Sequence, residues 1–425
     1  MSTFSGFYKL SVKERLEKIK EFANLSDGEC KLLEKQAALG LEQADRMIEN
    51  VIGTTQLPLG VATNFIIDGK EKLIPMSIEE PSVVAGASKA AKLALPDGFK
   101  TKVDESIMIG QIQMLNVKDT EKAMKEIEKS KKNILDLANE QDKVLTKFGG
   151  GARDVETHKI DTERGQMIIV HLLVDVRDAM GANAVNTMCE AIAPLLESIT
   201  KGEARLRIIS NLATYRLAHA EAVWKKETLG PETIEHILDA YHFAENDQYR
   251  CTTHNKGVMN GIDALMIATG NDFRAIEAGA HSYASTNGYR PLTTYEKTEK
   301  GNLKGFITVP MAVGIVGGAT RTHPIAQICM KILKIKTAQE LARIAAALGL
   351  AQNFAALLAL STEGIQRGHL KLHAANFAVM AGASGDIIDK IVEKMIEEGN
   401  ISYEKASELL KKFQRLSDSK ATSET

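Results

Sequence analysis

The sequence predicts an α+β fold in which a large, mainly helical domain contains an inserted strand–helix unit and is followed by a small helical domain. Three observations support this prediction. The 425 residues are more than one typical domain holds. Residues 106–212 carry strand and helix patterns in the order β-α-β-β-α-β, which is typical of a split, ferredoxin-like unit. A break of small residues, AGASG at 381–385, separates the last amphipathic helices from the rest of the chain.

The amino-terminal part begins with helices and then changes to strands. Two capping-box patterns, at 11–14 and 26–29, begin the first two helices, and a third helical stretch ends near residue 50. Two strands are predicted on either side of an Asp68-Gly69 turn. Pro81 then suits the first position of a helix, so we expect Glu80 at the mouth of that helix.

The inserted unit begins with a strand at 106–115 and a long charged helix from 118 to about 146. A glycine-rich turn and two extended runs follow, of which QMIIVHLLVDV is the clearer. A second helix starts near Ala179, and the strand EARLRIISNL completes the set. Because helical patterns resume after Leu212, we expect this unit to interrupt a larger domain.

Beyond the insertion, the sequence predicts a hairpin that turns at Gly301-Asn302 and a strong helix over 337–362. Two short amphipathic helices follow the AGASG break, and the polar residues from Ser417 onward are expected to be a disordered tail. The predicted boundaries are 1–105 and 213–373 for the two parts of the large domain, 106–212 for the inserted domain, and 374–425 for the carboxyl-terminal domain with its tail.

Composition excludes several classes of protein. The 53 basic and 55 acidic residues leave a net charge of −2, which provides no strong field for nucleic acid or an anionic membrane. The 4 cysteines are far apart without a CxxC pair, so neither a metal site nor a disulfide framework is indicated, and a reducing cytoplasm fits best. The amino terminus has no apolar core of signal-peptide length. The apolar stretch 344–360 contains Gln352 and Asn353, which favours a buried core helix over a membrane span.

Three polar segments lie among apolar or small residues: IEEPSVVAGAS with Glu80, CTTHNKGVMNG with Lys256, and ATGNDFRAIEAGAH with Asp272. A lysine between two carboxylates can stay charged in a secluded site and stabilise an oxyanion as it forms on a carbonyl. The alternative is that each residue makes its own surface ion pair or helix cap. Spacing alone does not show that the three residues meet.

Two further segments carry candidate groups. His369 precedes the carboxyl-terminal domain, and a histidine can protonate a leaving group near neutral pH; a packed histidine is the alternative, and His373 competes for the role. Gly181, Ala182 and Asn183 begin the second helix of the inserted unit, where free backbone N–H groups can receive a diphosphate. An ordinary helix start explains this segment equally well, and no GxGxxG fingerprint follows a strand.

Seven motifs together resemble those of the hydroxymethylglutaryl-coenzyme A reductase family, in its class II branch. In chain order they are ENVIG (49–53), EEPSVVAGAS, DAMGAN, THNKG, ATGND, GIVGGATRTHP (314–324) and RGH (367–369). The resemblance covers nearly the whole chain. It implies an enzyme of the mevalonate pathway that interconverts hydroxymethylglutaryl-coenzyme A with mevalonate and coenzyme A, using two nicotinamide cofactors and no metal. The implied intermediates are mevaldyl-coenzyme A and mevaldehyde.

The resemblance implies four catalytic roles. Lys256 would polarise the thioester oxygen and stabilise the oxyanion, and Asp272 would orient this lysine. Glu80 would supply a proton as the aldehyde becomes the alcohol. His369 would protonate the departing coenzyme A thiolate, so that the thiol does not add back to the aldehyde.

The same resemblance implies binding residues. Ser82, Arg250, Asn260 and Gln352 would hold the acyl group, with Arg250 suited to a carboxylate. The inserted domain would bind the nicotinamide cofactor, and the residues expected to hold its diphosphate are Asp178, Met180, Gly181, Ala182, Asn183 and Asn186. Asp142 would meet the adenine ribose and repel the additional phosphate of NADPH, so NADH is the expected cofactor and NADPH the alternative.

The resemblance also implies an assembly, a homodimer with an active site shared between subunits, and it allows a trimer of dimers. Two alternative functions stay open at this point. Lys256 could form a Schiff base or a cysteine could attack an acyl thioester, neither of which needs a nicotinamide. A nucleotide-binding protein without turnover would bind the cofactor and not consume it.

Overall fold

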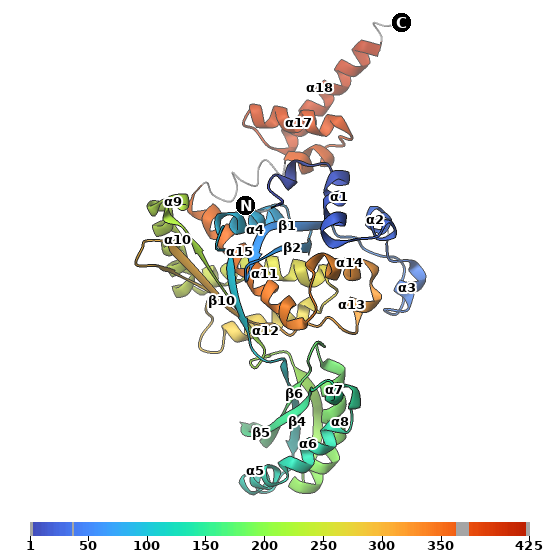
Figure 1. Ribbon diagram of the computed structural model, residues 1–425, viewed down its shortest axis with the longest axis vertical. Helices are drawn as coiled ribbons and strands as arrows, with labels where there is room; N and C mark the ends of the chain where they lie inside the picture. Colours follow the sequence, from blue (N-terminus) through green and yellow to red (C-terminus); the bar gives the residue numbers. More distant parts are fainter. Residues whose placement is uncertain (1–2, 36–37, 363–373, 422–425) are drawn as a thin grey trace.

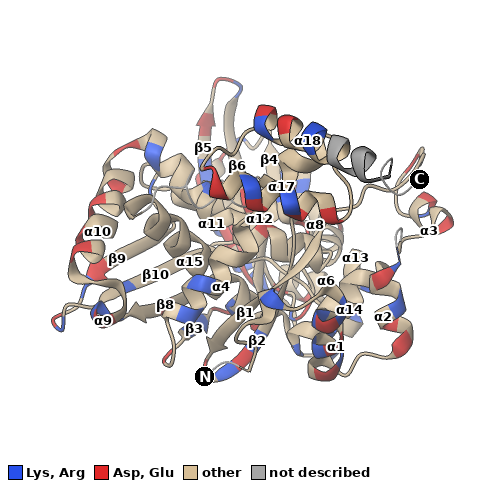
Figure 2. Cartoon of the chain, turned by 90° about the horizontal axis from the view of Figure 1, so that it is seen from above, with Lys and Arg blue, Asp and Glu red and all other residues tan. Residues whose placement is uncertain are grey.

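The structure is a computed structural model that describes residues 3–35, 38–362 and 374–421 (Figure 1). The inserted unit and the carboxyl-terminal helices lie at opposite ends of the molecule, with the large domain between them. Acidic and basic residues are interspersed over the helices in Figure 2. The mixed helix-and-sheet architecture confirms the predicted fold class.

The large domain is built on a six-stranded sheet in the order β2-β1-β3-β8-β10-β9. Its strands are β1 (Leu59–Ile67), β2 (Lys70–Ser77), β3 (Phe99–Val103), β8 (Leu217–Trp224), β9 (Thr293–Lys297) and β10 (Leu303–Pro310). Only the β1–β3 pair is parallel. The two predicted hairpins, β1–β2 and β9–β10, are confirmed. The expectation of a helix directly after Leu212 is wrong, because β8 comes first and pairs with β3 and β10.

Three helices pack on this sheet and on one another: α4 (Val83–Leu93), α11 (Gln248–Ala268) and α15 (Ala338–Ser361). Alanine and glycine along α15 allow close approach, so most of that helix is buried, and the Trp224 and Phe354 rings stack with centroids 3.8 Å apart. Among the described helices, α15 is long and apolar enough to cross a membrane, but 72% of its most apolar window is buried in the fold. The predicted core helix is therefore confirmed.

The inserted unit has its own four-stranded antiparallel sheet in the order β5-β6-β4-β7. Its strands are β4 (Ile107–Leu115), β5 (Gly151–Thr162), β6 (Gly165–Asp175) and β7 (Glu203–Ser210). The long helix expected from residue 118 is divided into α5 (Thr120–Lys129), α6 (Lys131–Asn139) and α7 (Lys143–Lys147). With α8 (Ala182–Thr200) these elements give the predicted βαββαβ order.

The other helices named in the described part of the chain are η1 (Phe7–Lys9), α1 (Val12–Ala23), α2 (Asp27–Glu34), α3 (Leu41–Asp45), α9 (Lys226–Leu229), α10 (Pro231–Asn246), α12 (Phe273–Ala284), α13 (Ala319–Thr322), α14 (Pro324–Leu333), α17 (Asp386–Glu397) and α18 (Tyr403–Ala421). Both predicted capping boxes are present, at the starts of α1 and α2. The tail prediction is wrong for residues 417–421, which continue α18. The helix expected to start at Pro81 starts two residues later, at Val83.

Candidate active site

Lys256 and Glu80 lie side by side, although 176 positions separate them in sequence. Lys256 is near the middle of α11, and Glu80 lies in the turn between β2 and α4, two elements that pack against α11. The Lys256 Nζ donates a hydrogen bond of 2.9 Å to the Glu80 Oε2. Both side chains are partly exposed, 56% for Lys256 and 37% for Glu80, so a ligand can reach them. The structure thus joins two of the three predicted polar segments.

Two buried polar atoms near this pair have no partner. The Oγ of Ser82 and the Oε1 of Gln352 are both buried without a hydrogen bond. Ser82 also has a left-handed backbone, with φ of +73°, which is uncommon for a residue with a side chain. Because an unpaired buried polar atom is costly, such atoms are exceptions that need an explanation. A ligand with complementary donors and acceptors provides one.

Gln352 is placed between two helices that carry the other residues of this region. A Cβ added to Gly86 of α4 would lie 3.6 Å from the Gln352 Nε2, and one added to Gly261 of α11 would lie 3.0 Å from the Gln352 Cβ. The glycines therefore make room for the glutamine on α15. Their small size is needed because three helices converge at this point.

Arg250 and Asn260 extend the region along α11. Burial lowers the pKa of the Arg250 guanidinium, and no carboxylate of the described residues forms an ion pair with it. Asn260 follows Lys256 by one helical turn and therefore lies on the same side of α11. We call Glu80, Ser82, Arg250, Lys256, Asn260 and Gln352 the lysine half-site.

Asp272 does not contact Lys256 within the chain. Its carboxylate caps α12 by accepting from the backbone N–H of Arg274 and Ala275, and it accepts from the Arg274 Nε at 3.1 Å. Partial burial would raise the pKa of Asp272, but these hydrogen bonds outweigh burial and lower it. Lys256 lies twelve residues before the end of α11 at Ala268, which corresponds to about 18 Å of helix. A lysine flanked by two carboxylates is therefore not formed in one subunit.

Asp272 lies instead beside the segment predicted to bind a diphosphate. The Asn271 Oδ1 accepts from the Gly314 N–H at 2.8 Å, and the next residue, Ile315, donates its N–H to the Asp178 carbonyl at 2.9 Å. Three motifs, ATGND, GIVGG and DAMGAN, thus meet in one chain. We call the residues Asp178–Asn183, Asp272 and Gly314 the glycine half-site.

The start of α8 has the features of a diphosphate site. Gly181 is the N-cap residue, with φ of +105°, and no side chain caps the first turn, so its N–H groups are free of side-chain partners. A Cβ at Gly181 would lie 2.5 Å from the Val176 Cγ1, so only glycine fits. These groups suit an anion at the helix start. Met180, Ala182 and Asn183 flank this glycine, and Asn183 is exposed.

Three predicted cofactor residues have structural partners in the chain. The side chain of Asp142 caps α7 by accepting from the Leu145 N–H. The Asp178 Oδ1 accepts from the Ala338 N–H at the start of α15, and the Asn186 Oδ1 accepts from the Ile209 N–H of β7. Each has a second oxygen or an amide group left to offer a ligand. The predicted His369, and its competitor His373, lie outside the described residues.

A buried polar network behind Lys256 was missed from the sequence. Asn353 accepts hydrogen bonds from the Thr293 and Tyr295 hydroxyls and donates to the His254 carbonyl of α11. Burial lowers the pKa of His254 to about 3, so this histidine is neutral. The only signal in the sequence is the pair Gln352-Asn353 within an otherwise apolar helix.

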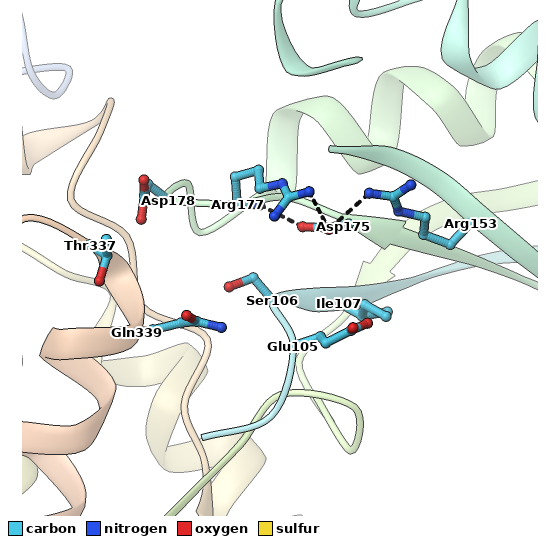
Figure 3. Close-up of a pocket in the computed structure, with 9 residues that line it drawn as sticks. All are labelled: Glu105, Ser106, Ile107, Arg153, Asp175, Arg177, Asp178, Thr337 and Gln339. Carbon is cyan, nitrogen blue, oxygen red and sulfur yellow. Dashed lines mark hydrogen bonds and ion pairs between the residues drawn. The ribbon is translucent and has the colours of Figure 1, made fainter. Parts of the chain in front are cut away.

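A cavity of about 600 Å³ lies between the inserted unit and the start of α15 (Figure 3). On one wall Arg153 and Arg177 both turn toward Asp175, with N–O distances of 3.2 and 3.5 Å. The other lining residues are Glu105, Ser106, Ile107, Asp178, Thr337 and Gln339. Within the described ranges, no three histidine, cysteine or acidic side chains are grouped so that they could hold a metal ion.

A lysine–carboxylate pair beside unpaired polar atoms, together with an uncapped glycine helix start on a separate domain, fits the class of enzymes that place a phosphate-containing cofactor against a carbonyl substrate. Comparison with known proteins identifies the family within this class. The family model described as hydroxymethylglutaryl-coenzyme A reductase matches residues 11–374. The chain belongs to this family.

Individual relatives agree with that assignment. The 3-hydroxy-3-methylglutaryl-coenzyme A reductase of Archaeoglobus fulgidus is 61% identical over 414 residues, which cover 97% of this chain and 95% of the relative. The solved structure of the Streptococcus pneumoniae enzyme is 41% identical, with a TM-score of 0.83, and covers 97% of this chain and 100% of that one. A second S. pneumoniae structure, described as class II and bound to NADPH in open conformations, has a TM-score of 0.80 and 41% identity, covering 95% of this chain and 100% of that one. The family and the class expected from the seven motifs are therefore confirmed.

Proposed function

We propose that this chain catalyses the four-electron interconversion of hydroxymethylglutaryl-coenzyme A and mevalonate plus coenzyme A, in the cytoplasm and within the mevalonate pathway. The observation that carries the proposal is the Lys256–Glu80 pair beside the unpaired Ser82 and Gln352. Arg250 has no carboxylate partner in the described chain and suits the free carboxylate of the acyl group.

Lys256 is the electrophilic group in this proposal. Its ammonium donates a hydrogen bond to the thioester oxygen and stabilises the oxyanion that forms when the carbonyl carbon is reduced. The nicotinamide, when bound, supplies the two electrons of each reduction. Ser82, Asn260 and Gln352 orient the acyl group, so that its carbonyl lies against Lys256.

Glu80 and His369 move the protons. The Glu80 carboxyl, which lies 2.9 Å from the Lys256 Nζ, supplies the proton when mevaldehyde becomes the alcohol. His369 protonates the coenzyme A thiolate when mevaldyl-coenzyme A collapses, so that the thiol does not add back to mevaldehyde.

The active site is shared between two subunits in our proposal. Asp272 caps its own α12 far from Lys256, so Asp272 can orient a lysine only if that lysine belongs to a second copy of the chain. The lysine half-site of one subunit would then face the glycine half-site of the other, within a homodimer or a trimer of dimers.

The start of α8 binds the cofactor diphosphate in this proposal, and Asp142 meets the adenine ribose. An acid at that position favours NADH. The solved S. pneumoniae relative was bound to NADPH, so the preference needs a direct test. Comparing kcat/KM for the two cofactors settles it, and a strong preference for NADPH would contradict the role of Asp142.

The test of the overall function is a stoichiometry. Purified protein is mixed with hydroxymethylglutaryl-coenzyme A and NADH or NADPH, and oxidised nicotinamide is counted against released thiol. The proposal expects two nicotinamides for each thiol. Thiol release without oxidation would favour a hydrolase or a Schiff-base enzyme, and cofactor binding without any consumption would favour a non-catalytic protein.

A further inference from the structure

The segment that begins the glycine half-site joins β6 to α8 and lies where the inserted unit contacts the large domain. Residues 176–181 leave β6 and pass between the cavity of Figure 3 and the loop 311–318. Arg177 and Asp178 of this segment line the 600 Å³ cavity, whereas Val176 and Gly181 are buried. Hydrogen bonds from the large domain therefore act together with this packing to fix where the first turn of α8 lies.

Arg216 makes three of these bonds. It lies where the chain returns from the inserted unit, just before β8, and it is 5% exposed. Its Nη1 donates to the carbonyls of Ala179 at 3.1 Å and Met180 at 3.3 Å, and its Nη2 donates to the Val313 carbonyl at 2.6 Å. One guanidinium thus joins the DAMGAN segment to the GIVGG loop.

The chemistry of these contacts is unusual for a buried arginine. Within the described chain, no carboxylate lies in ion-pair distance of Arg216, and Asp175 and Asp178 act on it only at longer range. A buried cation normally needs a paired charge, so retaining an arginine here is expensive. Its planar fork can bind carbonyls of two separate segments at once, which a lysine ammonium cannot reproduce with the same geometry.

The backbone of the two segments is also in close contact. A Cβ added to Gly314 would lie 2.6 Å from the Met180 nitrogen and 3.1 Å from the Ala179 carbonyl carbon. Gly314 in turn donates to Asn271, the neighbour of Asp272. Any movement of this contact would therefore change the position of the α8 start relative to Asp272.

We propose that Arg216 is a positioning residue for cofactor binding, which holds the segment 178–181 against the loop 313–316 and so fixes the first turn of α8 where the diphosphate binds. This inference rests on the proposed function only in identifying the ligand as a dinucleotide. Arg216 does not touch the cofactor. Its effect is specific to the glycine half-site.

The first test replaces Arg216 with lysine and with methionine in the full-length protein. We expect the Kd for NADH and NADPH, measured by nucleotide fluorescence, and the cofactor KM to rise about tenfold or more in Arg216→Met and less in Arg216→Lys. The KM for hydroxymethylglutaryl-coenzyme A should change less than about twofold, because the lysine half-site is untouched. Arg343→Met is the matched control, since Arg343 donates to the Thr101 carbonyl within the large domain and has no contact with the cofactor segment.

A second variant tests the same contact if loss of Arg216 impairs folding. Gly314→Ala inserts a methyl group between the two segments and should give the same selective loss of cofactor affinity, whereas Gly40→Ala, where a Cβ would meet nothing within 4 Å, should not. Equal rises in both KM values, or unchanged cofactor affinity in folded Arg216→Met or in Gly314→Ala, would overturn the proposal. Because the binding assay needs no turnover, a wild-type protein that binds but does not oxidise the cofactor would refute the proposed function alone.

Discussion

The lysine half-site and the glycine half-site are built in different ways. The lysine half-site offers side chains, and two of them, Ser82 and Gln352, have buried atoms without partners. The glycine half-site offers backbone N–H groups at the start of α8, and its acids, Asp178 and Asp272, already cap helices. The lysine half-site is therefore prepared for a ligand by unpaired side-chain atoms, and the glycine half-site is prepared by the position of its backbone.

The largest effect is expected in the lysine half-site. Lys256→Ala should lower kcat by about a hundredfold or more, because removing one oxyanion donor typically costs roughly 3 kcal/mol. Cofactor affinity should change little, because the diphosphate is bound by backbone N–H groups at the start of α8 and Lys256 contacts the thioester oxygen. Steady-state kinetics and nucleotide fluorescence measure both quantities, with Lys300→Ala in the exposed hairpin turn as the control. Weakened cofactor binding in Lys256→Ala would break the separation of the two half-sites.

A smaller and more selective effect is expected for His369→Gln. Reduction of hydroxymethylglutaryl-coenzyme A should fall by about a hundredfold, the lower end of what one general acid contributes. Reduction of free mevaldehyde should be spared, because that half-reaction expels no thiol. Assays of the wild type and the variant with each of the two substrates give the loss of activity for each half-reaction. Equal losses would contradict the assigned role.

Gln352→Met sharpens the claim that unpaired atoms prepare the lysine half-site. We expect the KM for the thioester to rise about tenfold, while the free energy of unfolding stays the same or increases, because an unsatisfied buried oxygen is removed. The neighbouring Asn353→Leu is the matched comparison. Asn353 has three buried partners, so its loss should destabilise the fold by about 2 kcal/mol or more. Denaturant titration distinguishes the two, and a clear loss of stability in Gln352→Met would contradict the assignment.

A last effect, on the pH dependence of stability and not on turnover, concerns Asp263, which lies on α11 between Lys256 and Ala268. Burial and the neighbouring Glu277 of α12 raise the pKa of Asp263 to about 8. The Glu277 carboxylate also lies 3.8 Å from the His281 Nε2. The folded protein therefore binds a proton more tightly than the unfolded chain, and this contribution to stability is lost as pH rises from about 4 to about 8. Asp263→Asn should flatten the pH dependence of unfolding in this window. A variant with an unchanged profile would show that Asp263 does not hold the proton.

Local patterns predicted the elements whose signal lies in adjacent residues. The capping boxes, the Asp68-Gly69 and Gly301-Asn302 hairpins and the βαββαβ order were all readable. β3 and β8 were missed because FKTKV is short and charged, and because the alanines of LAHAEAVW suit a helix as well as a strand. Tertiary pairing makes them strands: β3 pairs with β1 and β8, and β8 pairs with β3 and β10.

The candidate site was predictable as a set of residues and not as an arrangement. The motifs supplied Glu80, Lys256 and Asp272, but only the length of α11 reveals that the third lies in a different place from the other two. Arg216 and Asn353 had no motif, because each acts through backbone or side-chain partners that come from distant parts of the sequence.

The most direct test of the shared site is subunit complementation. Lys256→Ala and Asp272→Asn proteins, each expected to be nearly inactive, are mixed and reassembled after reversible dissociation, with each variant treated alone as the control. If the two half-sites come from different subunits, each hybrid dimer holds one intact site, and random mixing should restore about a quarter of wild-type activity. No recovery, despite hybrid dimers detected by differential tagging, would show that Lys256 and Asp272 act within the same chain and would contradict the account.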